Sequence, residues 1–201
     1  MNFTDPPHLP DARRQLRAHE AIDRQQLAAA LAVGEETQWL MFWGHRANPD
    51  APIHSACLSQ WWHAPFQTGG TSYRTAEHYM MAGKARLFGD RAAEQRILSA
   101  EHPGQAKALG RSVRGFSEEL WAARRVELVI AGNLAKFDQH PRLREFLLST
   151  GTSVLVEASP YDRIWGIGLR ASDPRAADPV RWPGLNLLGF ALMQVRTMLV
   201  V

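Results

Sequence analysis

The chain has 201 residues, 45% of them hydrophobic and 21% charged, which is typical of a globular protein with one domain-sized core. No apolar run approaches the roughly 20 residues that a membrane-spanning helix needs, and the first residues lack the apolar core of a secretory signal peptide. The net charge of +3 comes from basic residues interleaved with acids, which fits a phosphorylated or nucleotide-like ligand better than a dedicated DNA-binding module.

The first 35 residues are predicted to form an extension of a domain that spans residues 36–201. Residues 11–33 are rich in Ala, Arg, Gln and Leu, which favour a helix, with Asp11 as its N-cap and Gly34 at its end. The apolar face of this helix is thin. We therefore expect it to pack on the edge of the domain, with a dimer-forming helix as the alternative.

A short aromatic run over residues 37–43 is bounded by turn signals and predicts a strand. Phe42 and Trp43 end this run, and Arg46 follows in a loop. A guanidinium there could bind a phosphate through two parallel hydrogen bonds. An ordinary solvated loop arginine is an equally good interpretation.

The segment over residues 76–88 is predicted to be a helix entered from a hairpin over residues 64–73. Thr75 is its predicted N-cap, and Glu77 falls in the first turn, where the helix dipole favours a carboxylate. Lys84 lies two turns further on, roughly 10 Å along the axis and on the same face. One face thus offers an acid and an amine, unless this is simply a surface helix with one residue of each charge.

Lysine is scarce in this sequence, which holds three lysines against twenty arginines. Where arginine is the usual cation, a lysine can be present because an amine can lose its proton and a guanidinium cannot. This observation favours a chemical role for Lys84.

Capping residues and breakers place the remaining elements. Asp90 and Ser117 are predicted N-caps, and Pro103 suits the first turn of a helix. The fold class predicted from these signals is α+β, predominantly helical, in a single domain with a few short strands. After the helix over residues 76–88, the sequence predicts helices over residues 91–100, 103–110, 117–137, 142–150 and 184–196, and a strand over residues 154–157.

Two further stretches carry candidate ligand contacts. Arg111 directly follows a glycine at a helix end, where it could meet a phosphate or be an ordinary loop residue. Asp162 and Trp165 bracket a turn, and Gly166 and Gly168 flank Ile167, as expected where the backbone must approach another group closely. A Gly-rich turn with a buried tryptophan is the plain alternative.

Three separated stretches of the chain resemble the NADAR family, also described as YbiA-like. The resemblance covers about residues 39–199, and a closing segment with Asn186 and Gly189 adds to it. The chain departs from the family pattern at Gln60, where asparagine is commoner, and at Ile167, where some members have aspartate. The matching residues are Glu77-His78-Tyr79 with Lys84, Trp121 with Asn133 and Lys136-Phe137, and Asp162 with Trp165-Gly166.

Family members include N-glycosidases that act on riboflavin-biosynthesis intermediates and hydrolases that remove ADP-ribose from guanine. The resemblance therefore implies hydrolysis of a bond between ribose C1 and a nitrogen. In one route a carboxylate, Glu77 or Asp162, stabilises an oxocarbenium-like state and orients water. In the other, Lys84 forms a Schiff base with the opened sugar, helped by a pKa lowered through burial near Tyr79. We favour an essential Glu77.

The resemblance also implies a set of ligand contacts and a class of partner. The partner is a small nucleotide-like substrate, or ADP-ribosylated nucleic acid, with no membrane. A non-catalytic module that reads ADP-ribose is the alternative, although it would need no set of Glu77, Lys84 and Asp162. The implied substrate-binding residues are Phe42, Trp43, Arg46, Tyr79, Arg111, Trp121, Trp165, Gly166 and Asn186.

No cofactor or metal is predicted. The eight histidines are scattered, with no His-x-x-x-His pair, and no Gly-rich phosphate loop or dinucleotide fingerprint is present. Cys57 is the only cysteine, which excludes an intramolecular disulfide and predicts a reducing compartment, the cytoplasm. A nucleophilic Cys57 beside His54 is conceivable, but an unreactive thiol is the better prediction.

Overall fold

The computed structural model describes residues 16–45 and 52–200. Arg46 and the predicted N-cap Asp11 lie outside the described residues. Within the described ranges, no helix combines the length and the apolar character needed to cross a membrane.

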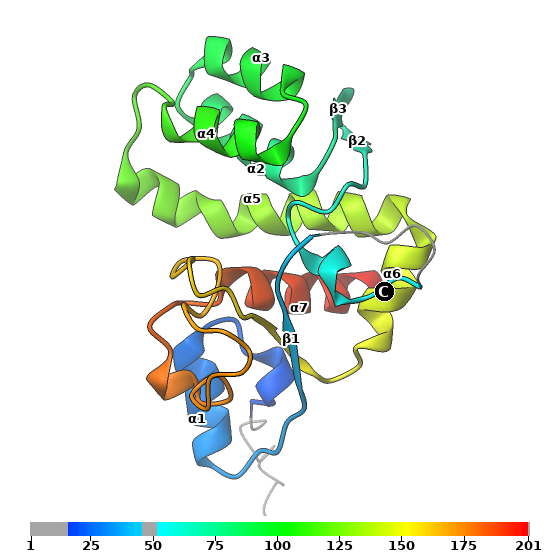
Figure 1. The fold of residues 1–201 in the computed structure, drawn as a ribbon, viewed down its shortest axis with the longest axis vertical. Helices are drawn as coiled ribbons and strands as arrows, with labels where there is room; N and C mark the ends of the chain where they lie inside the picture. Colours follow the sequence, from blue (N-terminus) through cyan, green and yellow to red (C-terminus); the bar gives the residue numbers. More distant parts are fainter. Residues whose placement is uncertain (1–15, 46–51, 201) are drawn as a thin grey trace, which may run out of the picture.

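One long helix, α5 (Glu118–Gln139), lies across the middle of the molecule. Figure 1 shows the C-terminal helix α7 (Leu187–Val200) on one side of it and a group of other helices on the opposite side. This group consists of α2 (Ala76–Leu87), α3 (Arg91–Ser99) and α4 (Pro103–Arg111), and α2 packs against both of the others and against α5. The predicted α+β class with a helical majority is therefore confirmed.

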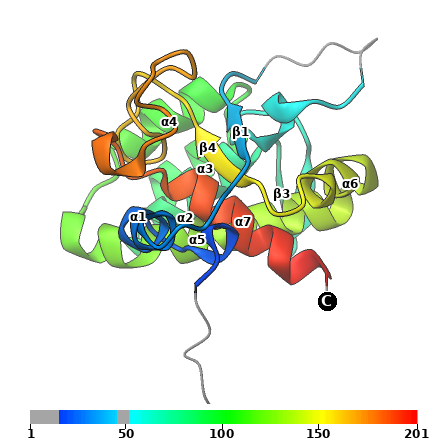
Figure 2. The same ribbon diagram turned by 90° about the horizontal axis from the view of Figure 1, so that it is seen from below.

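Two small sheets complete the fold. Strand β1 (Trp39–Phe42) pairs in parallel with β4 (Val154–Glu157), with Phe42 opposite Glu157 at the end of both strands. Figure 2 shows these strands side by side, and β4 also packs against α7. The second sheet is the predicted hairpin of β2 (Phe66–Thr68) and β3 (Thr71–Tyr73). Its turn residues Gly69 and Gly70 both have positive φ, which glycine adopts without steric cost.

Local capping signals place the starts of α2, α3 and α5 where the sequence predicts them. The Thr75 hydroxyl accepts from the backbone N–H of His78, and Asp90 accepts from that of Ala93. Ser117 caps α5 in the same way. These side chains satisfy backbone donors that a helix leaves free at its N-terminus.

The predicted helix over residues 11–33 is wrong in its described part. The chain there forms a short turn of 3₁₀ helix, η1 (Ala18–Glu20), and then helix α1 (Arg24–Ala32). Asp23 has an extended backbone and its side chain accepts from Gln26 N–H, so the helix begins only after it. Helix α1 packs with Leu27 and Ala30 buried.

The last helix also begins later than predicted. Asn186 has a φ of 55°, a left-handed conformation that no α-helix continues through, and α7 therefore starts at Leu187. The backbone before it, including Gly184, is hydrogen-bonded to residues 163–167 instead. The remaining elements are η2 (Ser55–Leu58), α6 (Pro141–Ser149) and η3 (Pro179–Arg181).

Candidate active site

A cavity of about 810 Å³ opens where the carboxyl ends of β1 and β4 meet η2 and α4. Aromatic side chains, carboxylates and two cations of α4 line it together. The lining side chains that can bind or react are Trp43, His45, His54, Ser55, Ser59, Trp61, Lys107, Arg111, Glu157, Ser159, Tyr161 and Asp162.

Glu77 does not line this cavity, but several residues that do line it act on its carboxyl group. Its residue is only 2% exposed, its backbone N–H donates to the carbonyl of Gln60, and its Oε1 is buried with no hydrogen-bond partner among the described residues. Burial raises the pKa of Glu77 to about 7. Lys107 has the next largest effect and lowers this pKa, while Asp162 raises it. Both neighbours line the cavity, so the carboxyl group belongs to the same cluster.

Glu157 is a half-buried carboxyl group that lines the cavity, and no sequence motif predicted it. It is the last residue of β4, and its Oε2 is buried without a hydrogen-bond partner in the described structure. Burial raises the pKa of Glu157 to about 8, with Asp162 and Glu77 raising it further and Lys107 lowering it. A signal existed: a carboxylate that ends a buried apolar strand is well placed for a site, because ligands bind at the carboxyl ends of parallel strands.

Asp162 contributes to the cavity from the loop after β4. Its Oδ1 accepts from the backbone N–H groups of Ile164 and Trp165, which fixes the turn that the sequence predicted. Its Oδ2 lies 4.0 Å from the Nζ of Lys107 on α4. Lys107 is therefore held at the cavity by a carboxylate, and Arg111 lies one turn further along the same helix.

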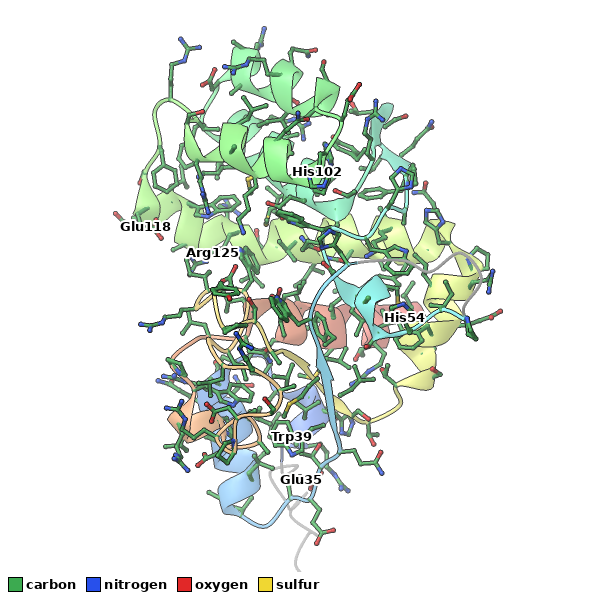
Figure 3. The ribbon with its side chains drawn as sticks, viewed as in Figure 1. Glu35, Trp39, His54, His102, Glu118 and Arg125 are labelled. Atoms are coloured by element: carbon green, nitrogen blue, oxygen red, sulfur yellow. The ribbon has the colours of Figure 1, made fainter. Side chains whose placement is uncertain are left out.

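The aromatic residues of the cavity come from three separate segments. The rings of Trp43 and Tyr161 lie with their centroids 6.0 Å apart, and both side chains are exposed. The Trp61 ring contacts the rings of His45 and His102, with centroid distances of 5.2 and 5.7 Å. Figure 3 shows His102 at the start of α4 and His54 beside η2. An exposed aromatic pair of this kind suits a planar heterocycle.

Two buried side chains of α5 hold the segment that carries Trp61. The Nζ of Lys136, which is fully buried, donates to the carbonyls of Cys57 and Ser59 at 2.7 and 3.0 Å. Asn133 donates to the side-chain oxygen of Gln60 at 2.7 Å. Gln60 thus faces α5 and is not among the cavity residues. Cys57 is buried as well, and burial raises the pKa of its thiol to about 11, which makes it a poor nucleophile.

Lys84 lies away from these groups. Its Nζ sits 4.1 Å from the ring centroid of Phe116 and 5.5 Å from that of Trp121, and the Glu118 carboxylate raises the pKa of the amine. Burial lowers the pKa of Lys84, as a Schiff-base lysine requires, but the residue does not line the cavity. Figure 3 shows Glu118 and Arg125 near the start of α5.

The other predicted contacts divide in the same way. Phe42, Trp43, Arg111 and Asp162 line the cavity, whereas several others do not. Tyr79 packs against Phe66 and Tyr73 near the hairpin. Trp121 is buried beside Lys84, and Trp165 packs on the core next to Gly166. The ligand-binding roles of these residues stay predictions.

Asn186 and Gly166 support β4 rather than the cavity wall. Asn186 is fully buried; its Oδ1 accepts from the Glu157 N–H at 2.9 Å and its Nδ2 donates to the Leu155 carbonyl at 2.9 Å. A Cβ on Gly166 would lie 2.8 Å from the carbonyl oxygen of Glu157. Both residues thus fix the backbone of Glu157. Among the described residues, no group of three or more His, Cys, Asp or Glu is arranged to hold a metal ion.

Comparisons with known proteins match this architecture. A family model described as the NADAR domain matches residues 41–200. The chain is 41% identical over 167 residues to N-glycosidase R617 of Acanthamoeba polyphaga mimivirus, covering 81% of this chain and 96% of that protein. It is 35% identical over 133 residues to a chloroplastic riboflavin biosynthesis protein, PYRR, of Zea mays, covering 63% of this chain and 20% of that protein. The NMR structure of the E. coli protein YbiA superposes with a TM-score of 0.63 and 25% identity, over 82% of this chain and 86% of YbiA.

Proposed function

The chain belongs to the NADAR family, and from this premise we propose that it is an N-glycosidase that hydrolyses a bond between ribose C1 and a nitrogen. The observation that carries the proposal is a pair of neighbouring carboxyl groups, Glu157 in the cavity lining and the buried Glu77 beside it, each with one buried oxygen that has no hydrogen-bond partner in the described structure. A group that must stay neutral in one step and charged in another needs such an environment.

The reaction proceeds through an oxocarbenium-like sugar. As the bond from C1 to nitrogen breaks, its electron pair leaves with the nitrogen and positive charge develops on the ribose. The Glu77 carboxylate stabilises that charge and accepts a proton from the water that adds to C1. With a pKa of about 7, Glu77 is ionised in a substantial fraction of molecules at neutral pH.

The remaining groups of the cavity account for recognition. Lys107 and Arg111 supply two positive charges on one helix face, which suits a sugar phosphate. Trp43 and Tyr161 can stack on the planar base. Base stacking is thus proposed for the exposed pair at the cavity, and ligand contacts of Trp121 and Trp165 stay predictions.

Two substrates share the ribosyl–nitrogen bond: a phosphorylated ribosylamino-pyrimidine of riboflavin biosynthesis, and ADP-ribosylated guanine, free or in nucleic acid. We place the pyrimidine first, because a relative of this chain is a riboflavin biosynthesis protein. A reducing compartment, the cytoplasm, fits both substrates and the single buried cysteine.

A head-to-head turnover assay on the two substrates tests this function. Release of the free base with one equivalent of ribose phosphate or ADP-ribose, followed by chromatography and mass spectrometry, supports it and identifies the substrate. A protein that binds either compound stoichiometrically without releasing product would instead be a non-catalytic reader of nucleotides.

The Schiff-base route through Lys84 predicts a covalent adduct, whereas the cavity geometry predicts none. Borohydride added during turnover should leave Lys84 unmodified, and Lys84→Met should keep most of the activity, because the amine lies against Phe116 and Trp121 and not among the charged groups of the cavity. Intact-mass and peptide mapping check this result, with Lys107 mapped in the same digest. A reduced sugar on Lys84, together with an inactive Lys84→Met variant, would replace the oxocarbenium route by the imine route.

A further inference from the structure

We propose that Glu157 is a catalytic general acid, which donates the proton that the leaving nitrogen needs as its bond to ribose C1 breaks. The inference rests on the proposed function. It assigns protonation of the leaving nitrogen to a residue of β4, whereas Glu77 lies on α2. The geometry points to this role in two ways. The carboxyl group of Glu157 lies at the end of β4 and lines the cavity, and its buried Oε2 has no hydrogen-bond partner in the described structure.

The backbone of Glu157 is held from three directions. The strand pairs it with Phe42 of β1, the Asn186 side chain accepts from its N–H at 2.9 Å, and its carbonyl accepts from the N–H of Ile167 at 2.9 Å. A residue that only filled space would not need such restraint. A proton donor does, because proton transfer requires its oxygen within hydrogen-bonding reach of the departing atom.

The unpaired oxygen is the second observation. A buried polar atom normally has a partner, and an unpaired one calls for an explanation such as an absent ligand. The Oε2 of Glu157 and the Oε1 of Glu77 are both buried and unpaired, and the two carboxyl groups influence each other electrostatically. A substrate that places its C1–N bond between them would give each oxygen a partner.

The surroundings separate the two carboxyl groups into different roles. Glu157 faces Asp162, Lys107 and Glu77, and Glu77 faces Lys107, Asp162 and Arg111, while His45 and His54 line the same cavity. Lys107 and Arg111 both lower the pKa of Glu77, whereas only Lys107 lowers the pKa of Glu157, and this difference favours the proton on Glu157. One ionised and one protonated carboxyl group is the arrangement that the reaction needs.

The protons balance over one turnover. Glu157 gives its proton to the nitrogen, which leaves as the neutral base with the electron pair of the broken bond. Water adds to C1 and its proton passes to Glu77. The site then holds a protonated Glu77 and an ionised Glu157, and exchange with solvent restores the starting state without any other reactant.

The test compares Glu157→Gln with the wild-type chain on two ribosyl–nitrogen bonds. A ribosylamino-pyrimidine must be protonated to leave, whereas the nicotinamide of nicotinamide mononucleotide leaves as a neutral pyridine and needs no proton. Glu157→Gln should lose about 100-fold or more in kcat on the pyrimidine, yet hydrolyse the mononucleotide at close to the wild-type rate. Glu145→Gln, an exposed site on α6, is the matched control and should equal the wild type on both substrates.

The pH dependence gives an independent readout. The wild-type rate on the pyrimidine should fall above a pH of about 8, where Glu157 loses its proton, and Glu157→Gln should lack that fall. Equal losses on both substrates, a retained basic limb, or full activity of Glu157→Gln on the pyrimidine would each overturn the role of Glu157. Full activity of the variant would leave the glycosidase function standing, whereas an inactive wild-type chain on every ribosyl–nitrogen substrate would remove that function itself. If the wild-type chain hydrolyses only the pyrimidine, the fall in its rate above a pH of about 8, and the absence of that fall in Glu157→Gln, decide the role of Glu157.

Discussion

Glu77→Gln is expected to lower kcat by at least about a thousandfold while leaving substrate affinity largely unchanged. The amide has the size of the carboxyl group but can neither stabilise a developing positive charge nor accept a proton from water. Rapid-quench turnover gives kcat, and isothermal titration with the substrate gives the affinity of the inactive variant.

The structure predicts that this variant folds. Glu77 is 2% exposed and burial raises its pKa, so ionised Glu77 costs the wild-type fold free energy above a pH of about 7. The pKa of Glu77 is higher in the folded chain than in the unfolded chain. The free energy of unfolding therefore falls as the pH rises from the unfolded pKa to the folded pKa. Glutamine does not ionise, so the variant does not show this fall. Glu77→Gln should therefore be at least as stable as the wild type at pH 8.

Wild-type turnover by the variant would show that another residue supplies the carboxylate.

Gly189→Ala should lower the free energy of unfolding by about 3 kcal/mol, which for a domain of this size lowers Tm by roughly 6–12 °C. Gly189 lies in the first turns of α7 where the helix crosses β4, and a Cβ there would collide with the carbonyl oxygen of Leu155. It would also press on the Asn186 amide, which holds the backbone of Glu157. Activity should fall together with stability.

Gly104→Ala is the matched control for this substitution, because it places the same methyl group in a helix without meeting backbone. The nearest atoms to its Cβ are in the side chains of His102 and Trp61, at 3.1 to 3.5 Å. Urea and thermal unfolding followed by circular dichroism compare the two variants. If Gly189→Ala unfolded at the same point as Gly104→Ala, the close contact between α7 and β4 would not be a requirement of the fold.

The sequence predicts those parts of the fold that depend on local chemistry. Thr75, Asp90 and Ser117 all cap helices as expected, because a capping side chain and its backbone partner lie within three residues of each other. In two places a helix begins later than predicted, because one residue of the predicted helix takes a non-helical backbone conformation. A residue inside a run of good helix formers, Asp23, takes an extended conformation, and Asn186 takes a left-handed one to serve contacts with β4.

The site was only partly predictable, because its groups meet through tertiary packing. Glu77 and Asp162 come to one cluster from distant parts of the chain, as the family resemblance implies. Glu77 and Lys84 share a helix face, as the sequence predicts, but two helical turns are long enough for the lysine to enter a separate aromatic environment. Lys107 was not singled out, since its partner Asp162 reaches it only in the folded chain.

Glu157 shows a different limit of sequence analysis. Its strand was predicted with the correct bounds, yet a carboxylate at a strand end looks the same whether it faces solvent or a cavity. Only the pairing of β4 with β1 and the support from Asn186 place it beside Glu77.

A structure of the Glu77→Gln variant with the ribosylamino-pyrimidine bound tests the central claim most directly. The account predicts that ribose C1 lies in the cavity about 3 to 4 Å from the side chain of residue 77. The leaving nitrogen should face Glu157, and the phosphate should lie against Lys107 and Arg111. A sugar bound against Lys84 and Trp121 instead, with the cavity holding only solvent, would contradict it.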